Sequence, residues 1–406
     1  MADSLLDGNT KIMPSDDPNH LVSKGVVLFP SSATDYGTQA DLDAALIAFV
    51  HRYCDVPPFW ERIIVAYVKL TWVFDRFTAI PYLRFLGEWS GGKTRMAQTT
   101  AVLAYRSIVA SGAMTAAVLF RLIEQFRGTC YLDEADFRSS DLWTEIVKVL
   151  NAGYKKNNPV LRCDKDNQPE AFDVFGPKIL TTRKRWQDAA LESRCITLEV
   201  QEKAKIRSDV PYQLPATFDA EARGLRNQLL MWRLRNYRNI QYNESKLRAS
   251  GLDPRMVEIA APLTAVSGSD FVDPLIQFLG KRAEEQRADT PQRYIVGAMR
   301  DLLGTARSKM VRVKEVGDAA NRLRAQEEPD AVREAMKHAK PGEEPVFFSA
   351  HRAGALIRSL GFKPEHTNSG NTFELNTGRI KELVQRYDPP EIEKGPTRAR
   401  LSPNAP

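Results

Sequence analysis

The sequence predicts an α/β fold: a parallel sheet covered by helices, followed by a helical lid and a small C-terminal domain of winged-helix type. First, the short apolar runs "PYLRFL", "GTCYLDEADF" and "GPKILTT" are separated by helical stretches, the pattern of a parallel sheet. Second, a glycine-rich turn joins the first run to a long helical stretch. Third, residues 291–388 indicate helices and a short strand, then a hairpin through "KPEHTNSGNTFELN".

The totals are those of a multidomain globular protein. The chain has 406 residues, of which 43% are hydrophobic and 27% charged, with a net charge of +6. No apolar run is long enough to span a membrane, and the acidic N-terminus lacks the features of a secretory signal. We therefore expect a cytoplasmic protein without a membrane partner, whose scattered cysteines are reduced thiols. The positive charge permits a polyanionic partner without requiring one.

Composition and periodicity divide the chain into five parts. We expect an N-terminal arm (1–38), an α/β core (39–218), a helical lid (219–290), the winged-helix domain (291–388) and a disordered, proline-rich tail (389–406). Five arginines fall in the helical pattern that begins the lid, at positions 223, 226, 233, 235 and 238. Because they do not all share one helical face, we expect a solvated or subunit-facing surface.

The stretch "GEWSGGKT" fits the phosphate-binding loop of nucleotide-binding proteins. In such a loop, glycines let backbone N–H groups surround phosphates, the lysine reaches the terminal phosphates and the hydroxyl binds Mg²⁺. The expected cofactors are therefore ATP and Mg²⁺. The residues expected to bind them are Gly87, Glu88, Trp89, Ser90, Gly91, Gly92, Lys93, Thr94 and Arg95.

Polar residues at the ends of later runs supply the remaining candidates. Asp133 and Glu134 follow an apolar strand, where one carboxylate can support Mg²⁺ and the other can polarise a water. Taken alone, such a pair equally suits a helix N-cap. Thr181 and Thr182 end the next run and can orient a water, although threonine also simply favours strands. Arg194, in "ALESRC", can project into a neighbour's nucleotide site or be an ordinary surface arginine.

In their order along the chain, these motifs resemble those of the AAA+ ATPases, and more narrowly the helicase modules of phage, plasmid and mobile-element replication proteins. The resemblance covers residues 40–270. It implies a Walker A loop at Gly87 to Thr94, a Walker B pair at Asp133 and Glu134, a sensor 1 at Thr181 or Thr182 (Thr182 is our choice) and an arginine finger at Arg194 that acts on the next subunit. It also suggests Arg255 as sensor 2. Sensor 1 is often asparagine in this family, which leaves the choice between the threonines open.

The stretch "GYKKNNPVLRCDKDNQPEAFDVF" predicts a hairpin. Related hexameric helicases carry a hairpin before sensor 1 that points into the central channel, so the resemblance implies that Lys155, Lys156, Arg162 and Lys165 bind nucleic-acid phosphates. A solvated charged hairpin is the alternative. In the winged helix, His351, Arg352 and Arg358 are placed to approach DNA, although such domains also bind proteins.

The sequence thus indicates an ATP-driven DNA helicase or translocase that forms a homo-oligomeric, hexameric ring on single-stranded or forked DNA and serves replication of a mobile element, plasmid or phage. Two alternatives stay open. One is a remodelling or loading ATPase that acts on protein–DNA complexes, including in genome defence. The other is a DNA-binding adaptor in which nucleotide only fixes assembly, and which would need neither Glu134 nor Arg194.

Overall fold

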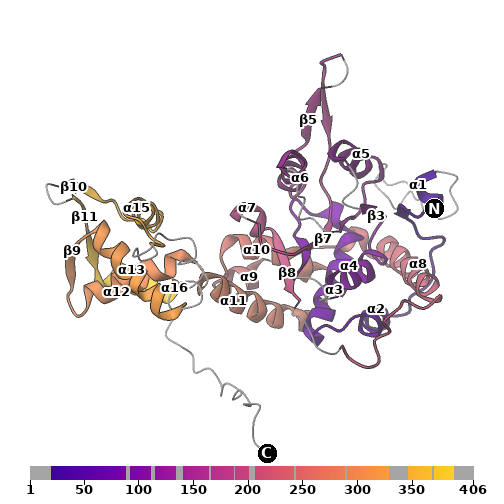
Figure 1. Cartoon of the computed structure of the whole chain (residues 1–406). Coiled ribbons are helices and arrows are strands. Elements are labelled where there is room, and N and C mark those ends of the chain that lie inside the picture. Colours follow the sequence, from indigo (N-terminus) through magenta and orange to yellow (C-terminus); the bar gives the residue numbers. More distant parts are fainter. Residues whose placement is uncertain are drawn as a thin grey trace, which may run out of the picture. The chain divides into compact units, whose positions relative to one another are not determined.

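A six-stranded sheet lies at the centre of the first of two compact units, Met1–Ile276 and Gln277–Pro406 (Figure 1). The computed structural model describes residues 20–87, 92–110, 115–133, 140–163, 166–186, 188–200, 206–241, 244–288, 290–328, 346–367 and 370–387. Within these residues, no helix is long and apolar enough to cross a membrane.

The strand order of the sheet is β1-β3-β4-β7-β2-β8. All neighbouring strands are parallel except the β1–β3 pair. The strands are β1 (Val27–Leu28), β2 (Tyr82–Leu86), β3 (Ser107–Ala110), β4 (Cys130–Leu132), β7 (Lys178–Thr182) and β8 (Cys195–Glu199). Because β2, β4 and β7 run the same way, their carboxyl ends meet at one edge, where open α/β sheets bind ligands.

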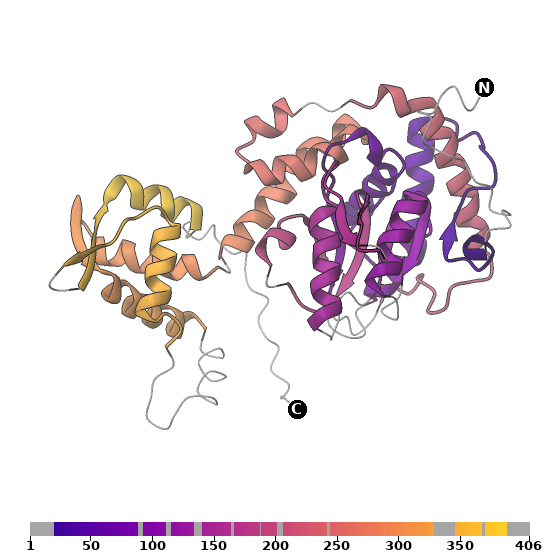
Figure 2. The same ribbon diagram turned by 90° about the horizontal axis from the view of Figure 1, so that it is seen from above.

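Helices flank the strands, as a parallel sheet requires for burial of both faces (Figure 2). Helix α2 begins with a capping box between Thr38 and Asp41, and α3 begins with Pro58 at its first position. Helix α4 packs against β2, β4 and β7. The helices around the sheet are α2 (Gln39–Tyr53), α3 (Pro58–Thr71), α4 (Lys93–Ala101), α5 (Ala116–Phe126), α6 (Ser140–Ala152) and α7 (Ala189–Glu192), with a 3₁₀ turn η1 (Phe74–Arg76) after α3.

The described part of the predicted N-terminal arm is built into this unit. Helix α1 (His20–Ser23) leads into β1, which pairs with β3 as the edge strand. Val27 and Phe29 are buried against Ile108 and Phe126. From residue 20 onwards the segment is therefore an integral edge of the sheet rather than an appendage.

In and just after helix α8 (Phe218–Asn236), the expectation of a solvated arginine surface holds for Arg223, Arg235 and Arg238, which are exposed, but is wrong for the other two arginines. Arg226 and Arg233 are 5% and 1% exposed. Arg226 donates to the backbone oxygen of Val102, and Arg233 forms an ion pair with Asp75 at 2.8 Å. Helical spacing of seven places both on the face that packs against the core. The chain continues through η2 (Tyr237–Asn239), α9 (Ser245–Ala249), α10 (Pro254–Ala265), η3 (Ser269–Phe271) and α11 (Val272–Ala288).

The second unit has its own core around a three-stranded antiparallel sheet of order β10-β11-β9. Ile295, Val316, Ile357 and Leu375 are among its fully buried side chains. Its elements are α12 (Pro291–Leu303), β9 (Ser308–Arg312), α13 (Val313–Glu327), α15 (Ala350–Ser359), β10 (Glu365–Thr367), β11 (Gly370–Asn376) and α16 (Thr377–Tyr387). Helices and a hairpin therefore occur in the expected order, and the winged-helix assignment stays a prediction.

A two-stranded hairpin, β5 (Val160–Cys163) with β6 (Pro169–Phe172), projects beyond α5 and α6 (Figure 1). Its base is held by Lys178, the first residue of β7, which is fully buried. The Lys178 ammonium donates to the backbone oxygens of Val174 (2.6 Å), Gly176 (2.9 Å) and Gly153 (3.4 Å). A Cβ at Gly153 would lie 2.4 Å from Lys178 Nζ. Both roots of the hairpin are thus joined to the strand that follows it.

We predict that Lys178→Met lowers the free energy of unfolding by ~1–3 kcal/mol, because buried carbonyl oxygens lose their donor. Burial lowers the pKa of Lys178 from its ordinary value of 10.5 to about 7. Between these values the unfolded chain binds more protons than the folded one, so this group's contribution to stability rises with pH. The deficit of the variant should therefore be larger at pH 9 than at pH 7 in urea unfolding. Lys24→Met, at an exposed lysine, is the control, and a deficit that shrinks with pH would contradict the prediction.

Candidate nucleotide site

The phosphate-binding loop predicted from the sequence lies between β2 and α4, at the carboxyl edge of the sheet. The Gly87 N–H donates to the backbone oxygen of Thr182 at 3.0 Å, which prolongs the β2–β7 pairing. A Cβ at Gly87 would lie 2.6 Å from the Val200 oxygen, so only glycine fits. Gly92 has φ +80°, the left-handed conformation that glycine adopts readily. The remaining loop residues, Glu88, Trp89, Ser90 and Gly91, lie outside the described residues.

Helix α4 starts at Lys93, and no side chain caps its N-terminus. The uncapped N–H groups of such a terminus suit an anion. Lys93 is buried, and its ammonium donates to the Gly87 oxygen at 2.9 Å, which holds the positive charge over the loop. The backbone donors and the ammonium therefore converge where phosphates would bind.

Two hydroxyl groups meet the carboxylate of Asp133, the residue directly after β4. Thr181 Oγ1 donates to Asp133 Oδ1 at 2.7 Å, and Thr94 Oγ1 lies 3.4 Å from the same oxygen. The Thr182 hydroxyl is buried and has no hydrogen-bond partner among the described residues. Of the two threonines considered from the sequence, the structure brings Thr181 to the carboxylate. Glu134 lies outside the described residues.

These residues fit ATP with Mg²⁺. The α4 N-terminus and Lys93 would hold the phosphates, and the oxygens of Thr94 and Asp133 are the hard ligands that Mg²⁺ prefers. Burial first, and then the charge of Asp133, raise the pKa of Tyr131 above its ordinary value, so the carboxylate lies beside a neutral phenol in a poorly solvated site.

Arg95 has a different contact from the one expected. Its guanidinium donates to the backbone oxygens of Pro211 at 3.0 Å and Tyr212 at 2.8 Å. It therefore ties the segment between β8 and α8 to the first turn of α4.

Arg194 lies at the opposite edge of the sheet. Its backbone oxygen accepts from Tyr82 N–H at the start of β2, five residues before Gly87, which corresponds to roughly 16 Å along a strand. Its guanidinium lies 5.3 Å from the centre of the Tyr154 ring. The Nε and Nη1 atoms of this guanidinium are buried without a hydrogen-bond partner in the described part of the chain. Arg194 therefore cannot reach the loop of its own chain.

Arg255, the candidate for sensor 2, lies near Arg194 rather than near the loop. It is the second residue of α10, its guanidinium is 5.2 Å from the centre of the same Tyr154 ring, and it donates to Glu258 at 2.6 Å. Tyr154 pairs with Ile80 through the backbone, just before β2 begins. In this conformation Arg255 does not contribute to the nucleotide edge of its own chain.

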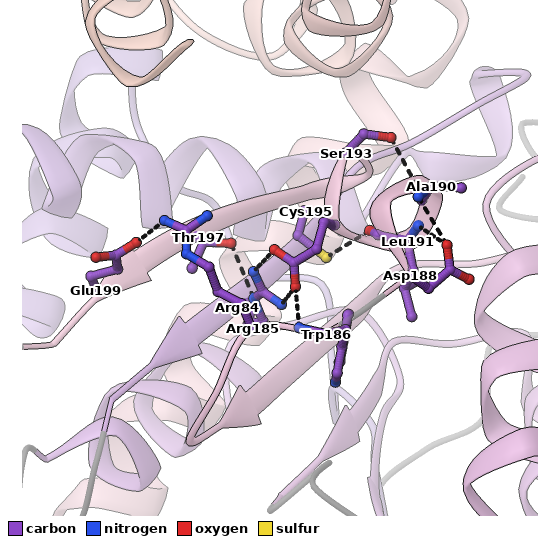
Figure 3. Close-up of polar contacts among 11 residues, drawn as sticks. Arg84, Arg185, Trp186, Asp188, Ala190, Leu191, Ser193, Cys195, Thr197 and Glu199 are labelled. Atoms are coloured by element: carbon purple, nitrogen blue, oxygen red, sulfur yellow. Dashed lines mark hydrogen bonds and ion pairs between the residues drawn. The ribbon is translucent and has the colours of Figure 1, made fainter. Parts of the chain in front are cut away.

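Sequence reasoning missed Arg84, in the middle of β2. This residue is 1% exposed, and its Nη1 and Nη2 atoms donate to the two carboxylate oxygens of Glu192 at 2.5 and 2.6 Å. Its Nε atom donates to Thr197 Oγ1 at 3.1 Å, and its guanidinium lies 4.7 Å from the centre of the Trp186 ring (Figure 3). The available signal was an arginine inside the apolar run "PYLRFL".

The basic residues assigned to the hairpin are mostly engaged within the chain. Lys155 forms an ion pair with Glu258 at 3.0 Å, and Lys156 donates to the backbone oxygen of Asp75. Arg162 pairs with Glu145 on α6. These contacts hold β5 and the segment just before it. Lys165, between β5 and β6 in the sequence, lies outside the described residues.

Comparisons with known proteins leave the family open. No family model matches the chain. The search of curated proteins gives no match either. Among solved structures, the SCCmec type IV Cch active helicase is similar with a TM-score of 0.41 and 12% identity over 84% of this chain and 68% of that chain. The JCV helicase is similar in two structures, one with a bound acetamide ligand, with TM-scores of 0.29 and 0.26, identities of 15% and 14%, and 65% of each chain covered. At these scores the likenesses carry no conclusion, and the proposals below rest on the contacts of this chain.

We predict that Thr181→Val lowers ATP turnover by about tenfold or more, because a hydrogen bond to a charged group contributes roughly 1.5–3 kcal/mol. Thr182→Val, which loses a buried hydroxyl that has no hydrogen-bond partner among the residues the structure describes, should have the smaller effect. Steady-state ATP hydrolysis of both variants tests the assignment. A larger loss in Thr182→Val would return the role of sensor 1 to that residue.

Proposed function

We propose that the chain is an ATP-hydrolysing DNA translocase of the helicase type, and that it works as a ring of identical subunits. The observation that supports this most directly is the meeting of Thr94 and Thr181 at Asp133, beside the lysine of a glycine-rich loop. An arrangement of this kind positions phosphates and a metal ion, and phosphoryl transfer depends mainly on positioning and charge stabilisation.

Each residue would then have one task. Lys93 holds the terminal phosphates, and Thr94 and Asp133 hold Mg²⁺, which when bound supplies positive charge against the phosphate oxygens. Glu134 accepts the proton of the attacking water, and Thr181 fixes the Asp133 carboxylate from β7. Asp133 follows a three-residue strand between β3 and β7, so its position is set by both neighbours.

The ring is supported by the position of Arg194. A guanidinium roughly 16 Å away along the strand cannot stabilise charge at its own loop, yet two of its nitrogen atoms lack a partner within the described residues. Head-to-tail assembly would bring this edge of one subunit to the nucleotide edge of the next. We therefore propose that Arg194 completes the site of the neighbouring subunit.

The hairpin of β5 and β6 is the proposed contact with DNA. Its base is joined to β7 through Lys178, and β7 also carries Thr181, which contacts Asp133. A change at the nucleotide edge can thus reach the hairpin along β7 and through the hydrogen bonds of Lys178. Since Lys155, Lys156 and Arg162 already have partners in the chain, we assign phosphate contact chiefly to Lys165.

We predict that Arg194→Ala and Lys93→Ala proteins are each inactive in ATP hydrolysis and recover activity when mixed. At equal amounts, recovery should reach up to about a quarter of wild-type turnover, because random head-to-tail assembly joins an intact loop to an intact arginine at about one interface in four. The control is a mixture of Arg194→Ala with a double Lys93→Ala, Arg194→Ala protein, which has no intact pairing. Failure to recover at any ratio, with mixed rings verified by native mass spectrometry, would contradict the shared site.

We predict that Lys165→Ala weakens binding of single-stranded DNA and reduces the slope of log affinity against log salt by about 0.7, the value for one phosphate contact on a single strand. Basal ATP hydrolysis should be unchanged, whereas its stimulation by DNA and strand displacement on a forked substrate should fall. Lys24→Ala, at an exposed lysine outside the hairpin, serves as the control. An unchanged salt slope in Lys165→Ala would remove this residue from the DNA interface.

A further inference from the structure

We propose that the ion pair between the buried Arg84 and the partly buried Glu192 sets the position of Arg194. The strand that leads into the phosphate-binding loop would then also fix the arginine offered to the next subunit. This inference rests on the proposed shared site. Neither Arg84 nor Glu192 touches the nucleotide edge, so both are positioning residues.

The pair adds a side-chain connection between the two functional segments to the backbone hydrogen bond from Tyr82 to Arg194. Arg84 is three residues before Gly87 in β2, and Glu192 is the last residue of α7, two residues before Arg194. The ion pair is bidentate, with distances of 2.5 and 2.6 Å. Two parallel N–H···O bonds fix orientation as well as distance, so α7 is held in one rotation relative to β2.

Helix α7 depends on such outside contacts. It has only four residues, and an isolated helix of that length does not form in water. At its start, the Asp188 carboxylate accepts the Ala190 N–H at 2.9 Å (Figure 3). It also accepts from the Asn151 side chain at 3.0 Å. At its end, Glu192 binds Arg84 and also accepts the Trp186 N–H at 2.6 Å. Arg194 lies two residues after the second of these two anchors.

Each member of the ion pair needs the other for the stability of the fold. A guanidinium in the centre of a sheet is tolerated only when a carboxylate and other acceptors compensate its lost hydration. Removal of one partner leaves a buried charge and is strongly destabilising, whereas replacement of both by apolar residues of similar size is often close to neutral. Apolar side chains could therefore stabilise this part of the fold equally well. That the chain carries an ion pair here favours a role in fixing the position of α7.

The consequence of a lost anchor is a displaced Arg194. Its guanidinium lies against the Tyr154 ring, and a displacement of about 1 Å in a group that stabilises a transition state lowers the rate on the order of 100-fold. The effect would appear in the neighbour's site, because Arg194 does not reach its own. A subunit without the ion pair should thus still hydrolyse ATP when its neighbour provides Arg194. Its own Arg194, however, should fail to complete the neighbour's site.

The test uses Arg84→Met with Glu192→Met, which replaces the pair by apolar side chains of similar length. In the first mixture, the double change is made in the Lys93→Ala subunits, whose own site is already inactive. The ATP hydrolysis recovered when these subunits are mixed with Arg194→Ala subunits should fall by tenfold or more. In the second mixture, the double change is made in the Arg194→Ala subunits instead. The ATP hydrolysis recovered with Lys93→Ala subunits should then stay within about twofold of the recovery without the double change. A purely structural role of the pair in β2 would give the opposite result.

The matched control is Arg185→Met with Glu199→Met in the Lys93→Ala subunit. This neighbouring ion pair is exposed, at 43% and 52% of its side chains (Figure 3), and recovery should equal that of Lys93→Ala alone. Far-UV circular dichroism and native mass spectrometry verify folding and ring incorporation. If the double methionine protein does not fold, Glu192→Gln keeps the shape but removes the charge and one of the two oxygens that accept from Arg84. Recovery of the Arg194→Ala subunits by Lys93→Ala, Glu192→Gln subunits should then fall severalfold.

Two results would overturn the proposal, and they have different consequences for the shared site. If the pair-less Lys93→Ala subunit restores Arg194→Ala subunits as fully as Lys93→Ala does, then the pair does not position Arg194, and the shared site stands. If Lys93→Ala itself restores nothing, then the shared site fails and this inference fails with it.

Discussion

The parallel register of β2 between β7 and β8 is the constraint on which the other features depend. Leu86 lies opposite Thr182 and Tyr82 lies opposite Cys195. The first pairing puts the phosphate-binding loop beside the end of β7, where Thr181 meets Asp133. The second puts Arg194 at the other edge. Because a strand has a fixed rise per residue, these two sets of groups cannot meet within one chain.

Buried basic side chains stabilise the joints between elements that this register separates. Lys178 joins both roots of the hairpin to β7, Arg84 joins α7 to β2, and Arg233 joins α8 to the segment at Asp75. All three are at most 1% exposed. Ionic or polar contacts require specific geometry, whereas apolar contacts accept many packings. We infer that these positions carry hydrogen-bonding side chains because each pair of elements must be held in one relative orientation.

Short motifs could be predicted from the sequence, but the partners of individual side chains could not. Glycines at 87 and 92, followed by Lys93 and Thr94, predict a strand, a turn and a helix because the backbone geometry needs those residue types. In contrast, successive strand residues point to opposite faces, and the sequence alone could not tell whether Thr181 or Thr182 faces Asp133. Arg233 looked solvent-exposed because its partner Asp75 is 158 residues away along the chain.

Arg194 and the hairpin share a support. Tyr154, whose ring lies against Arg194, directly follows Gly153, whose carbonyl oxygen accepts from Lys178. The next residue, Lys155, binds Glu258, which also binds Arg255. A movement of the hairpin root therefore displaces the surface on which Arg194 rests. In the proposed ring, a strand of DNA that pulls on the hairpin would in this way act on the neighbour's nucleotide site, and nucleotide binding there would in turn affect DNA binding, since coupling between two binding sites is reciprocal.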